Sequence, residues 1–367
     1  MNLAKFGINE RSGSRKIESS KLRLALLYSK AMIYASLLVF LAAFSIWAYK
    51  AMIDIRPKVN RPKLHKDAYQ IIDDLEARLK VHVEVLAEEI GPRGVFVPHK
   101  LNAAADYIRG FWKKAGYEVM AQTFRVQDIA CHNLTVEIPG KSKPDEIVVV
   151  GAHYDTVSWS PGANDNGSAV AALLELSRVF STKSTGRTLR FVAFANEEPP
   201  FFKTGSMGSL VYAKECRERK ENIVAMVCLE TIGYYQDERE TQKYPFPLSF
   251  FYPDKGNFVA VVGNLRSKAL VRSFTRNFME ESDFPVECAA PFGFITGIDW
   301  SDHWSFWHCG YPAVMITDTA LFRYPYYHSS RDTPDKIDYH SLARVTHGVY
   351  RALARMVVSG HGHSRPL

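Results

Sequence analysis

The stretch 148-VVVGAHYDTVSWSPGANDNGSAV-170 decides the fold, because it joins a buried strand to a helix through a polar loop. The three valines at its start are typical of a strand buried on both faces, and residues 169–176 have the spacing of an amphipathic helix. The loop between these two segments contains His153, Asp155 and Asp165. Loops held at the ends of buried strands commonly carry functional residues, so we expect a site here.

Helix-like and strand-like segments alternate along the chain around this stretch. The alternation predicts a three-layer α/β domain over residues 65–358, in which helices flank a mixed, mostly parallel twisted sheet. A polar tail follows at residues 359–367. The expected helices lie around residues 67–89, 100–115, 168–181, 267–281 and 339–358, and the expected strands at 146–152, 187–195, 222–229, 258–263 and 311–317.

The N-terminal part has a different composition. Residues 1–30 are basic, residues 31–49 carry no charge, and residues 50–64 are again basic and contain prolines. As a helix, the uncharged run is about 28 Å long, close to the thickness of a bilayer core. We therefore expect an uncleaved single-pass anchor at 31–49 and a linker at 50–64. Similar numbers of basic residues flank both ends of the run, so the positive-inside rule does not decide the orientation. An N-terminal anchor before a large domain usually leaves that domain on the outer side, so we expect the α/β domain on the extracytoplasmic side. A cleaved signal peptide and a buried core helix are the alternatives.

Charge and cysteine content narrow the possible partners. The formal net charge is +7, but the basic excess lies in the N-terminal segment and leaves the domain near neutrality. A nucleic-acid partner would need a basic face on the domain, and the sequence shows no sign of one. The five cysteines lack a CxxC spacing, so they give no reason to expect a cysteine metal site.

Histidines and carboxylates follow four of the five expected strands. Because the carboxyl ends of parallel strands meet at one edge of a sheet, we expect these side chains to lie together. Histidine and carboxylate ligands without cysteine suit zinc or another divalent ion. Five ligands are too many for one tetrahedral ion, so we expect two zinc ions with Asp165 as the bridge. The candidate ligands are His153, Asp165, Glu198, Glu230 and His328.

Glu197 stands beside a candidate ligand and needs a different role. Adjacent side chains at a strand end diverge, so we expect only Glu198 of this pair to bind metal. Glu197 is then free to take a proton from the attacking water and deliver it to a leaving amine. We also expect Asp155 and Asp332 to hold the imidazoles of the two candidate histidines.

Three further residues have open roles. His303 competes with His328 for the place of the last ligand, and the HSSRDTPDKID pattern favours His328. Asp302 and His303 line a pocket or brace a turn. Tyr327 stabilises an oxyanion or packs as an aromatic side chain.

The motifs GAHYDTV, GANDNGSAV, NEEP…MGS, LETIGYY and YYHSSRDTPDKID resemble the successive motifs of the M28 family of zinc peptidases. This resemblance covers residues 65–358 and implies a zinc aminopeptidase-like fold with a co-catalytic dizinc site. It implies Glu197 as the general base and a cis peptide bond between Asp165 and Asn166. The implied ligand sets are His153, Asp165 and Glu230 around one ion, and Asp165, Glu198 and His328 around the other.

The chain also departs from the family pattern. Many members have Asp where this chain has Glu230, and the segment 199–209 is longer and more apolar than usual. We interpret this segment, together with the aromatic stretches 292–300 and 320–327, as the wall of an apolar specificity pocket.

The expected function is a membrane-anchored dizinc metallopeptidase, an aminopeptidase that releases N-terminal residues from peptides. The alternatives are a carboxypeptidase of the same family, a glutaminyl-cyclase-like acyltransferase with one zinc ion, and a non-catalytic receptor on the same fold. The expected partners are a peptide substrate and a lipid bilayer. Residue preference, native metal and oligomeric state stay open.

Overall fold

The computed structural model describes residues 9–59 and 66–358 and divides the chain into two compact units between Ala51 and Met52. The first unit is the helix α1 (Asn9–Ala48). The helical stretch Ser20–Ile53 is long and apolar enough to cross a membrane, judged by length and composition. The helix therefore extends beyond both ends of the uncharged run 31–49. Residues 1–8 and 60–65 and the tail 359–367 lie outside the described residues.

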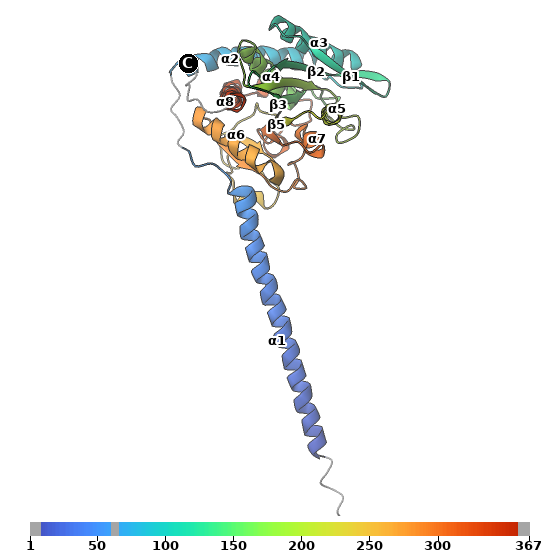
Figure 1. Cartoon of the computed structure of the whole chain (residues 1–367), viewed down its shortest axis with the longest axis vertical. Helices are drawn as coiled ribbons and strands as arrows, with labels where there is room; N and C mark the ends of the chain where they lie inside the picture. Colours follow the sequence, from blue (N-terminus) through green and yellow to red (C-terminus); the bar gives the residue numbers. More distant parts are fainter. Residues whose placement is uncertain (1–8, 60–65, 359–367) are drawn as a thin grey trace, which may run out of the picture. The chain divides into compact units, whose positions relative to one another are not determined.

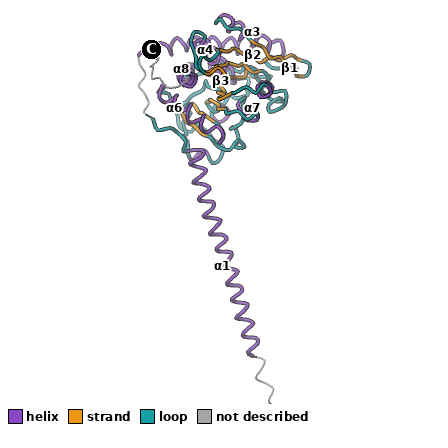
Figure 2. The backbone as a smooth tube through the Cα atoms, in the orientation of Figure 1, coloured by secondary structure: helices purple, strands orange, loops and turns teal. Residues whose placement is uncertain are grey.

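The second unit is a three-layer α/β domain built around one sheet (Figures 1 and 2). Its strands are β1 (Met120–Val126), β2 (Ile129–Ile138), β3 (Lys143–His153), β4 (Arg187–Phe194), β5 (Ile223–Glu230), β6 (Val259–Val262), β7 (Val286–Ala289) and β8 (Ala313–Thr317). Its helices are α2 (Lys66–Glu84), α3 (Pro98–Lys114), α4 (Ala169–Phe180), α5 (Gly208–Glu218), α6 (Lys268–Glu281), α7 (His303–His308) and α8 (Tyr339–Val357). Short helical turns are η1 (Tyr49–Ile53), η2 (Val85–Ile90), η3 (Ala163–Ser168), η4 (Leu248–Phe250), η5 (Leu265–Ser267), η6 (Ala320–Phe322) and η7 (Pro334–Lys336).

The sheet is mixed, and its centre is parallel. Among the described residues the strand order is β1-β2-β4-β3-β5-β8-β6-β7. The four central strands β4, β3, β5 and β8 run parallel, and β6 and β7 are parallel to each other. The pairs β1–β2, β2–β4 and β6–β8 are antiparallel. This arrangement confirms the predicted fold class.

Helices cover both faces of the sheet, which is why its central strands are almost wholly apolar. Val148 and Val150 of β3 point into the larger core cluster, formed with α2, α3, α4, α6 and α8. Ile147 and Val149 point to the other face, where α5 and α7 pack. All five expected strands and all five expected helices are present. The structure adds β1, β2, β7, α5 and α7, which the sequence did not predict.

The first residues of the second unit pack against the domain. Met52 and Ile55 are buried, and the backbone N–H of Ala290 donates to the Met52 carbonyl over 2.9 Å. The Arg56 guanidinium pairs with Glu287 at 2.7 Å. The segment expected to be an extended linker is thus attached to the domain at its beginning.

Glu175 of α4 is a buried carboxylate that ties α4 to α2. It accepts hydrogen bonds from Arg78 at 2.8 Å and from the Arg178 side chain, and its other oxygen lies 3.2 Å from His82 Nε2. Burial alone would raise the pKa of this carboxyl group. The hydrogen bonds from His82, Arg178 and Arg78 outweigh burial and lower the pKa to about 2.

The lowered pKa of Glu175 predicts a specific loss of stability in acid. The stabilisation is fully present above the unfolded-state pKa near 4.5 and disappears as the pH falls toward the folded-state value near 2. The shift corresponds to about 3 kcal/mol in the free energy of unfolding. Denaturant unfolding in detergent measures the difference in unfolding free energy between the wild type and Glu175→Gln. This difference should shrink by about 3 kcal/mol between neutral pH and strong acid. A difference independent of pH would contradict this assignment.

Candidate active site

The four central parallel strands bring their carboxyl ends to one edge of the sheet, as expected for a site in an α/β fold. His153 is the last residue of β3 and Glu230 is the last residue of β5. Glu197 and Glu198 follow the end of β4 within one short turn, and His328 lies on the loop after β8. All of these side chains except His328 are buried.

His153 is surrounded by three carboxylates. Its Nε2 atom lies 3.2 Å from Glu230 Oε2, 3.5 Å from Asp165 Oδ1 and 3.9 Å from Glu197 Oε2. Glu230 is held in turn by Ser301, whose hydroxyl donates to Glu230 Oε2 over 2.6 Å. These contacts form one half of the cluster.

His328 forms the other half of the cluster. Its Nε2 atom lies 3.1 Å from Asp165 Oδ2 and 3.1 Å from Glu198 Oε2. Burial lowers the pKa of His328, but the two adjacent carboxylates outweigh burial and raise the pKa to about 11. Asp165 therefore faces the two histidines with different oxygens, the geometry that a bridging ligand needs.

The loop around Asp165 is fixed by the asparagines on both sides of it. Asn164 Oδ1 accepts from the backbone N–H of Gly233 over 2.9 Å. Asn166 donates to the Leu229 carbonyl over 3.1 Å and accepts from the Thr231 N–H over 2.9 Å. The peptide bond between Asp165 and Asn166 is cis, as expected. The asparagines thus attach Asp165 to the end of β5, beside Glu230.

Asp155 orients the glutamate pair. Its two carboxylate oxygens accept from the backbone N–H groups of Glu197 and Glu198, over 3.0 and 3.1 Å. Its contact with the imidazole is looser, because His153 Nδ1 lies 3.6 Å from the Asp155 carboxylate and 3.2 Å from the Asp155 backbone carbonyl. Asp155 therefore connects the loop after β3 to the turn that carries Glu197.

Asp332 takes a different place from the one expected. Its carboxylate accepts from the N–H groups of Asn164 and Asp165 over 2.8 and 3.1 Å, and from the Tyr324 hydroxyl over 2.7 Å, rather than from the His328 imidazole. His328 has a positive φ of 53°, so the chain turns sharply there and does not follow helical spacing. Asp332 supports the backbone of Asp165 instead.

Asp302, His303 and Tyr327 lie around the cluster. His303 Nε2 contacts the Ile298 carbonyl at 2.8 Å, and burial lowers its pKa to about 4, so it braces a turn outside the cluster. Asp302 is fully buried, and burial raises its pKa to about 7. The Tyr327 ring stacks on the His328 imidazole with 3.9 Å between ring centroids.

Arg93 is a structural residue of the site that sequence reasoning missed. It is fully buried and donates to the carbonyls of Tyr154, Pro161 and Gly162 over 2.7, 2.7 and 3.0 Å. These carbonyls lie in the loop between His153 and Asp165. Burial lowers the Arg93 pKa to about 10. This value is still well above neutral pH, so the guanidinium stays charged. No periodic pattern in the sequence separates this arginine from a surface one.

Replacing Arg93 with Met should destabilise the domain and weaken metal binding. Several buried carbonyls would lose their donor, and the expected loss is about 3–5 kcal/mol of unfolding free energy. Denaturant unfolding and zinc titration of the full chain in detergent measure both effects. Arg125, whose side chain is 66% exposed, provides the matched control in Arg125→Met. Equal stability of the two variants would contradict the role given to Arg93.

The donor set fits metal ions. Ligand atoms of His153, Asp165 and Glu198 lie within 4.8 Å of one another and are buried. Among the described residues, Glu198 Oε1 is also a buried polar atom without a hydrogen-bond partner. Such atoms cost free energy unless a ligand satisfies them. Nitrogen and carboxylate oxygen donors without sulfur suit zinc and similar divalent ions.

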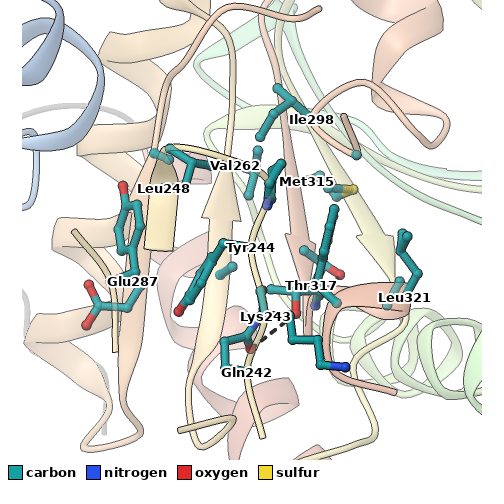
Figure 3. Close-up of a pocket in the computed structure, with 18 of the residues that line it drawn as sticks. Gln242, Lys243, Tyr244, Leu248, Val262, Glu287, Ile298, Met315, Thr317 and Leu321 are labelled. Carbon is teal, nitrogen blue, oxygen red and sulfur yellow. Dashed lines mark hydrogen bonds between the residues drawn. The ribbon is translucent and has the colours of Figure 1, made fainter. Parts of the chain in front are cut away.

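An apolar cavity of about 90 Å³ lies beside the cluster, with Glu230 and Tyr327 among its lining residues. Figure 3 shows Val262 and Met315 from the sheet, Tyr244 from a loop and Leu321 from η6 around this cavity. The two expected stretches contribute to its wall in part, through Thr296, Gly297, Ile298 and Trp300 of the first and Ala320, Leu321, Phe322 and Tyr327 of the second.

Segment 199–209 was expected to form part of the pocket wall, and this prediction is wrong for this cavity. No residue of the segment lines it. Instead, Phe201 stacks on Phe96 with 5.8 Å between ring centroids, and Lys203 pairs with Asp299 at 2.5 Å. These contacts hold the segment against neighbouring loops.

Two relatives illustrate what the chain is similar to in sequence. The Escherichia coli (strain K12) protein YfbL is 36% identical over 285 residues, which are 75% of this chain and 87% of that protein. Aminopeptidase YwaD of Bacillus subtilis (strain 168) is 40% identical over 85 residues, which are 23% of this chain and 18% of that protein.

Solved structures share the fold at low sequence identity. A zinc aminopeptidase from Bacillus subtilis is 15% identical with a TM-score of 0.61, covering 78% of this chain and 95% of that one. A glutaminyl cyclase from Macrostomum lignano is 18% identical with a TM-score of 0.61, and the match covers 85% of this chain and 98% of that one.

The family description that matches the chain is Peptidase family M28, and the match extends over residues 133–353. This range holds all five candidate ligands and Glu197. The chain therefore belongs to peptidase family M28, the family of zinc peptidases that its sequence motifs resemble.

Proposed function

We propose that this protein is a dizinc aminopeptidase anchored in a membrane by its N-terminal helix. The observation that carries the proposal is the position of Asp165, whose two oxygens face two different histidines. One zinc ion would be held by His153, Asp165 and Glu230, and the second by Asp165, Glu198 and His328. Bound zinc would polarise the scissile carbonyl and lower the pKa of the attacking water.

Glu197 is the proposed general base. Its backbone is held by Asp155, and its Oε2 atom lies 3.9 Å from His153 Nε2, at the edge of the cluster. Burial raises the Glu197 pKa well above 4.5, although His153 opposes this, and bound cations would lower it. A carboxylate in this place can take a proton from the attacking water at Oε2 and pass it to the leaving amine.

Release of N-terminal residues is supported by the name of one relative and by the cavity. Aminopeptidase YwaD matches a short part of this chain at 40% identity. The apolar cavity reaches the candidate ligand Glu230, so it can receive the side chain of the residue that is released. We therefore expect bulky apolar first residues to be preferred.

The proposed setting is a bilayer crossed by the helix Ser20–Ile53, which has the length and composition of a membrane span. The peptidase domain would then lie on the extracytoplasmic side. The proposed organisation is a basic segment at 1–30, an anchor core at 31–49, a connecting segment at 50–64 and the peptidase domain at 65–358. Its partners would be a peptide substrate and the lipid around the helix.

The test compares peptides that differ only at their termini. The full chain in detergent, loaded with zinc, is incubated with a mixed library whose N-termini are free or acetylated, and the products are identified by mass spectrometry. Removal of single residues from free N-termini only, stopped by a chelator, is the expected result. Cleavage from the carboxyl end would identify a carboxypeptidase and overturn the proposal.

A glutaminyl-cyclase-like acyltransferase is the second candidate, because a glutaminyl cyclase shares the fold with the same TM-score as the aminopeptidase. Including peptides that begin with glutamine separates the two functions. A cyclase would convert that glutamine to a ring with loss of ammonia and leave every peptide bond intact. An unreactive protein that also binds no zinc would indicate the receptor alternative.

A further inference from the structure

The peptidase domain exposes aromatic rings on two loops. Phe246 and Phe250 are 82% and 74% exposed, and Phe294 is 83% exposed. The rings of Phe246 and Phe250 lie edge to face at 6.0 Å, and Phe292 stacks on Phe294 at 5.2 Å. Neither 244-YPFPLSFFY-252 nor 290-APFGFITGI-298 contains a charged residue. Grouped exposed rings on uncharged loops are typical of an interaction surface.

The two loops, here called the aromatic loops (residues 244–252 and 290–298), are neighbours in space. The Tyr252 hydroxyl donates to the Cys288 carbonyl over 2.9 Å, two residues before the second loop begins. Both loops also contribute to the wall of the cavity beside Glu230, through Tyr244, Leu248 and Ile298 among others. The exposed rings themselves do not line that cavity.

The aromatic loops adjoin the point where the chain enters the peptidase domain. Ala290, the first residue of the second loop, donates its N–H to the Met52 carbonyl over 2.9 Å. Glu287, three residues earlier, pairs with Arg56. Met52 belongs to the helical stretch Ser20–Ile53 that is apolar enough to cross a membrane. The second aromatic loop is therefore hydrogen-bonded to Met52, one residue before the end of that stretch.

We propose that the aromatic loops dock on the surface of the bilayer that the N-terminal helix crosses. Exposed phenylalanine rings gain free energy when they are buried at the boundary between lipid headgroups and acyl chains. Since the same loops wall the cavity beside the metal cluster, docking places the active site at the bilayer surface. The substrates favoured there are peptides attached to, or partly embedded in, the same bilayer. This inference rests on the proposed membrane anchor and on the proposed peptidase site.

Fluorescence quenching in liposomes tests the docking directly. The full chain carries an environment-sensitive nitrobenzoxadiazole label on Phe250→Cys or Phe294→Cys, with Asp128→Cys on the exposed β1–β2 turn as the matched control. Unsubstituted protein corrects for labelling of the native cysteines, of which four are buried. Lipids with a nitroxide headgroup should quench most of the fluorescence at positions 250 and 294 and little at 128.

The outcomes separate the docking from the anchor. Protein that fails to float with liposomes would overturn the anchor, and the docking with it. Protein that floats but shows equal quenching by lipid at all three positions would overturn the docking alone. Labels at 250 and 294 that are shielded from both lipid and soluble iodide would mean that another copy of the chain covers the loops, which also overturns it.

An activity comparison tests the consequence for substrates. The triple variant Phe246→Ser, Phe250→Ser, Phe294→Ser should cleave a short soluble peptide at the wild-type rate, because the exposed rings do not line the cavity. Cleavage of the same peptide held in liposomes by a C-terminal acyl chain should slow several-fold. Equal slowing on both peptides, or no slowing on either, would overturn the proposal. No cleavage of the soluble peptide by the wild type would instead count against the proposed function.

Discussion

Replacing Glu197 with Gln is expected to lower kcat by about a hundredfold to ten-thousandfold, while the zinc content stays unchanged. Glutamine keeps the size of the side chain and the backbone hydrogen bond to Asp155, but it cannot accept a proton. Of this glutamate pair, only Glu198 is a proposed zinc ligand, so the Glu197→Gln substitution should leave zinc binding unchanged. Steady-state kinetics and zinc analysis of the same sample measure the two effects.

The neighbouring residue provides the sharpest contrast. Glu198→Gln should lower zinc content as well as kcat, because Glu198 Oε2 lies 3.1 Å from His328 Nε2 within the proposed second metal position. Asp145→Asn, on an exposed part of β3, serves as the surface control. Near-normal turnover in Glu197→Gln would show that the base is another residue. Loss of zinc in Glu197→Gln would show that it is a ligand.

Replacing Asp165 with Asn should have the largest effect of any single change. The carboxylate contributes one oxygen to each half of the cluster. An asparagine amide has only one oxygen that can coordinate a metal ion, and this oxygen carries no charge. Both metal positions should therefore lose affinity together, and peptidase activity should fall at least as far as in Glu197→Gln. His153→Ala and His328→Ala, by comparison, each remove a ligand from one position only.

Thermal unfolding with and without zinc measures the loss in Asp165→Asn without relying on activity. A ligand that binds only the folded state raises its stability by about 2.7 kcal/mol when present at a hundred times its Kd. The wild type should therefore show a clear zinc-dependent rise in Tm, and the variant little or none. Asp335→Asn is the control, because it changes an exposed carboxylate in the motif that contains His328. This variant should respond to zinc like the wild type. An undiminished response in Asp165→Asn would refute the bridging role.

Much of the fold could be predicted because burial on both faces leaves a clear pattern. The continuous apolar runs of β3, β4 and β5 correspond to strands covered on both sides. β1 escaped prediction because this edge strand alternates exposed and half-buried residues, many of them polar. The helix α7 has only six residues, too few to show a helical period.

The candidate site could be predicted where the chemistry lies at strand ends, and less well where it depends on loop geometry. His153, Asp165, Glu198, Glu230 and His328 form the cluster that the motifs indicated. Asp332 was expected beside His328 from its spacing, but the left-handed turn at His328 redirects it to the backbone of Asp165. Arg93 gave no signal, since its role depends on carbonyl groups that only the folded loop gathers.

Zinc-edge anomalous diffraction from crystals of the full chain would test the two-metal site most directly. The account predicts two peaks on opposite sides of Asp165, one between His153 and Glu230 and the other between Glu198 and His328. A single peak would contradict the dizinc mechanism and favour the cyclase-like alternative. Peaks away from Asp165 would refute the site itself.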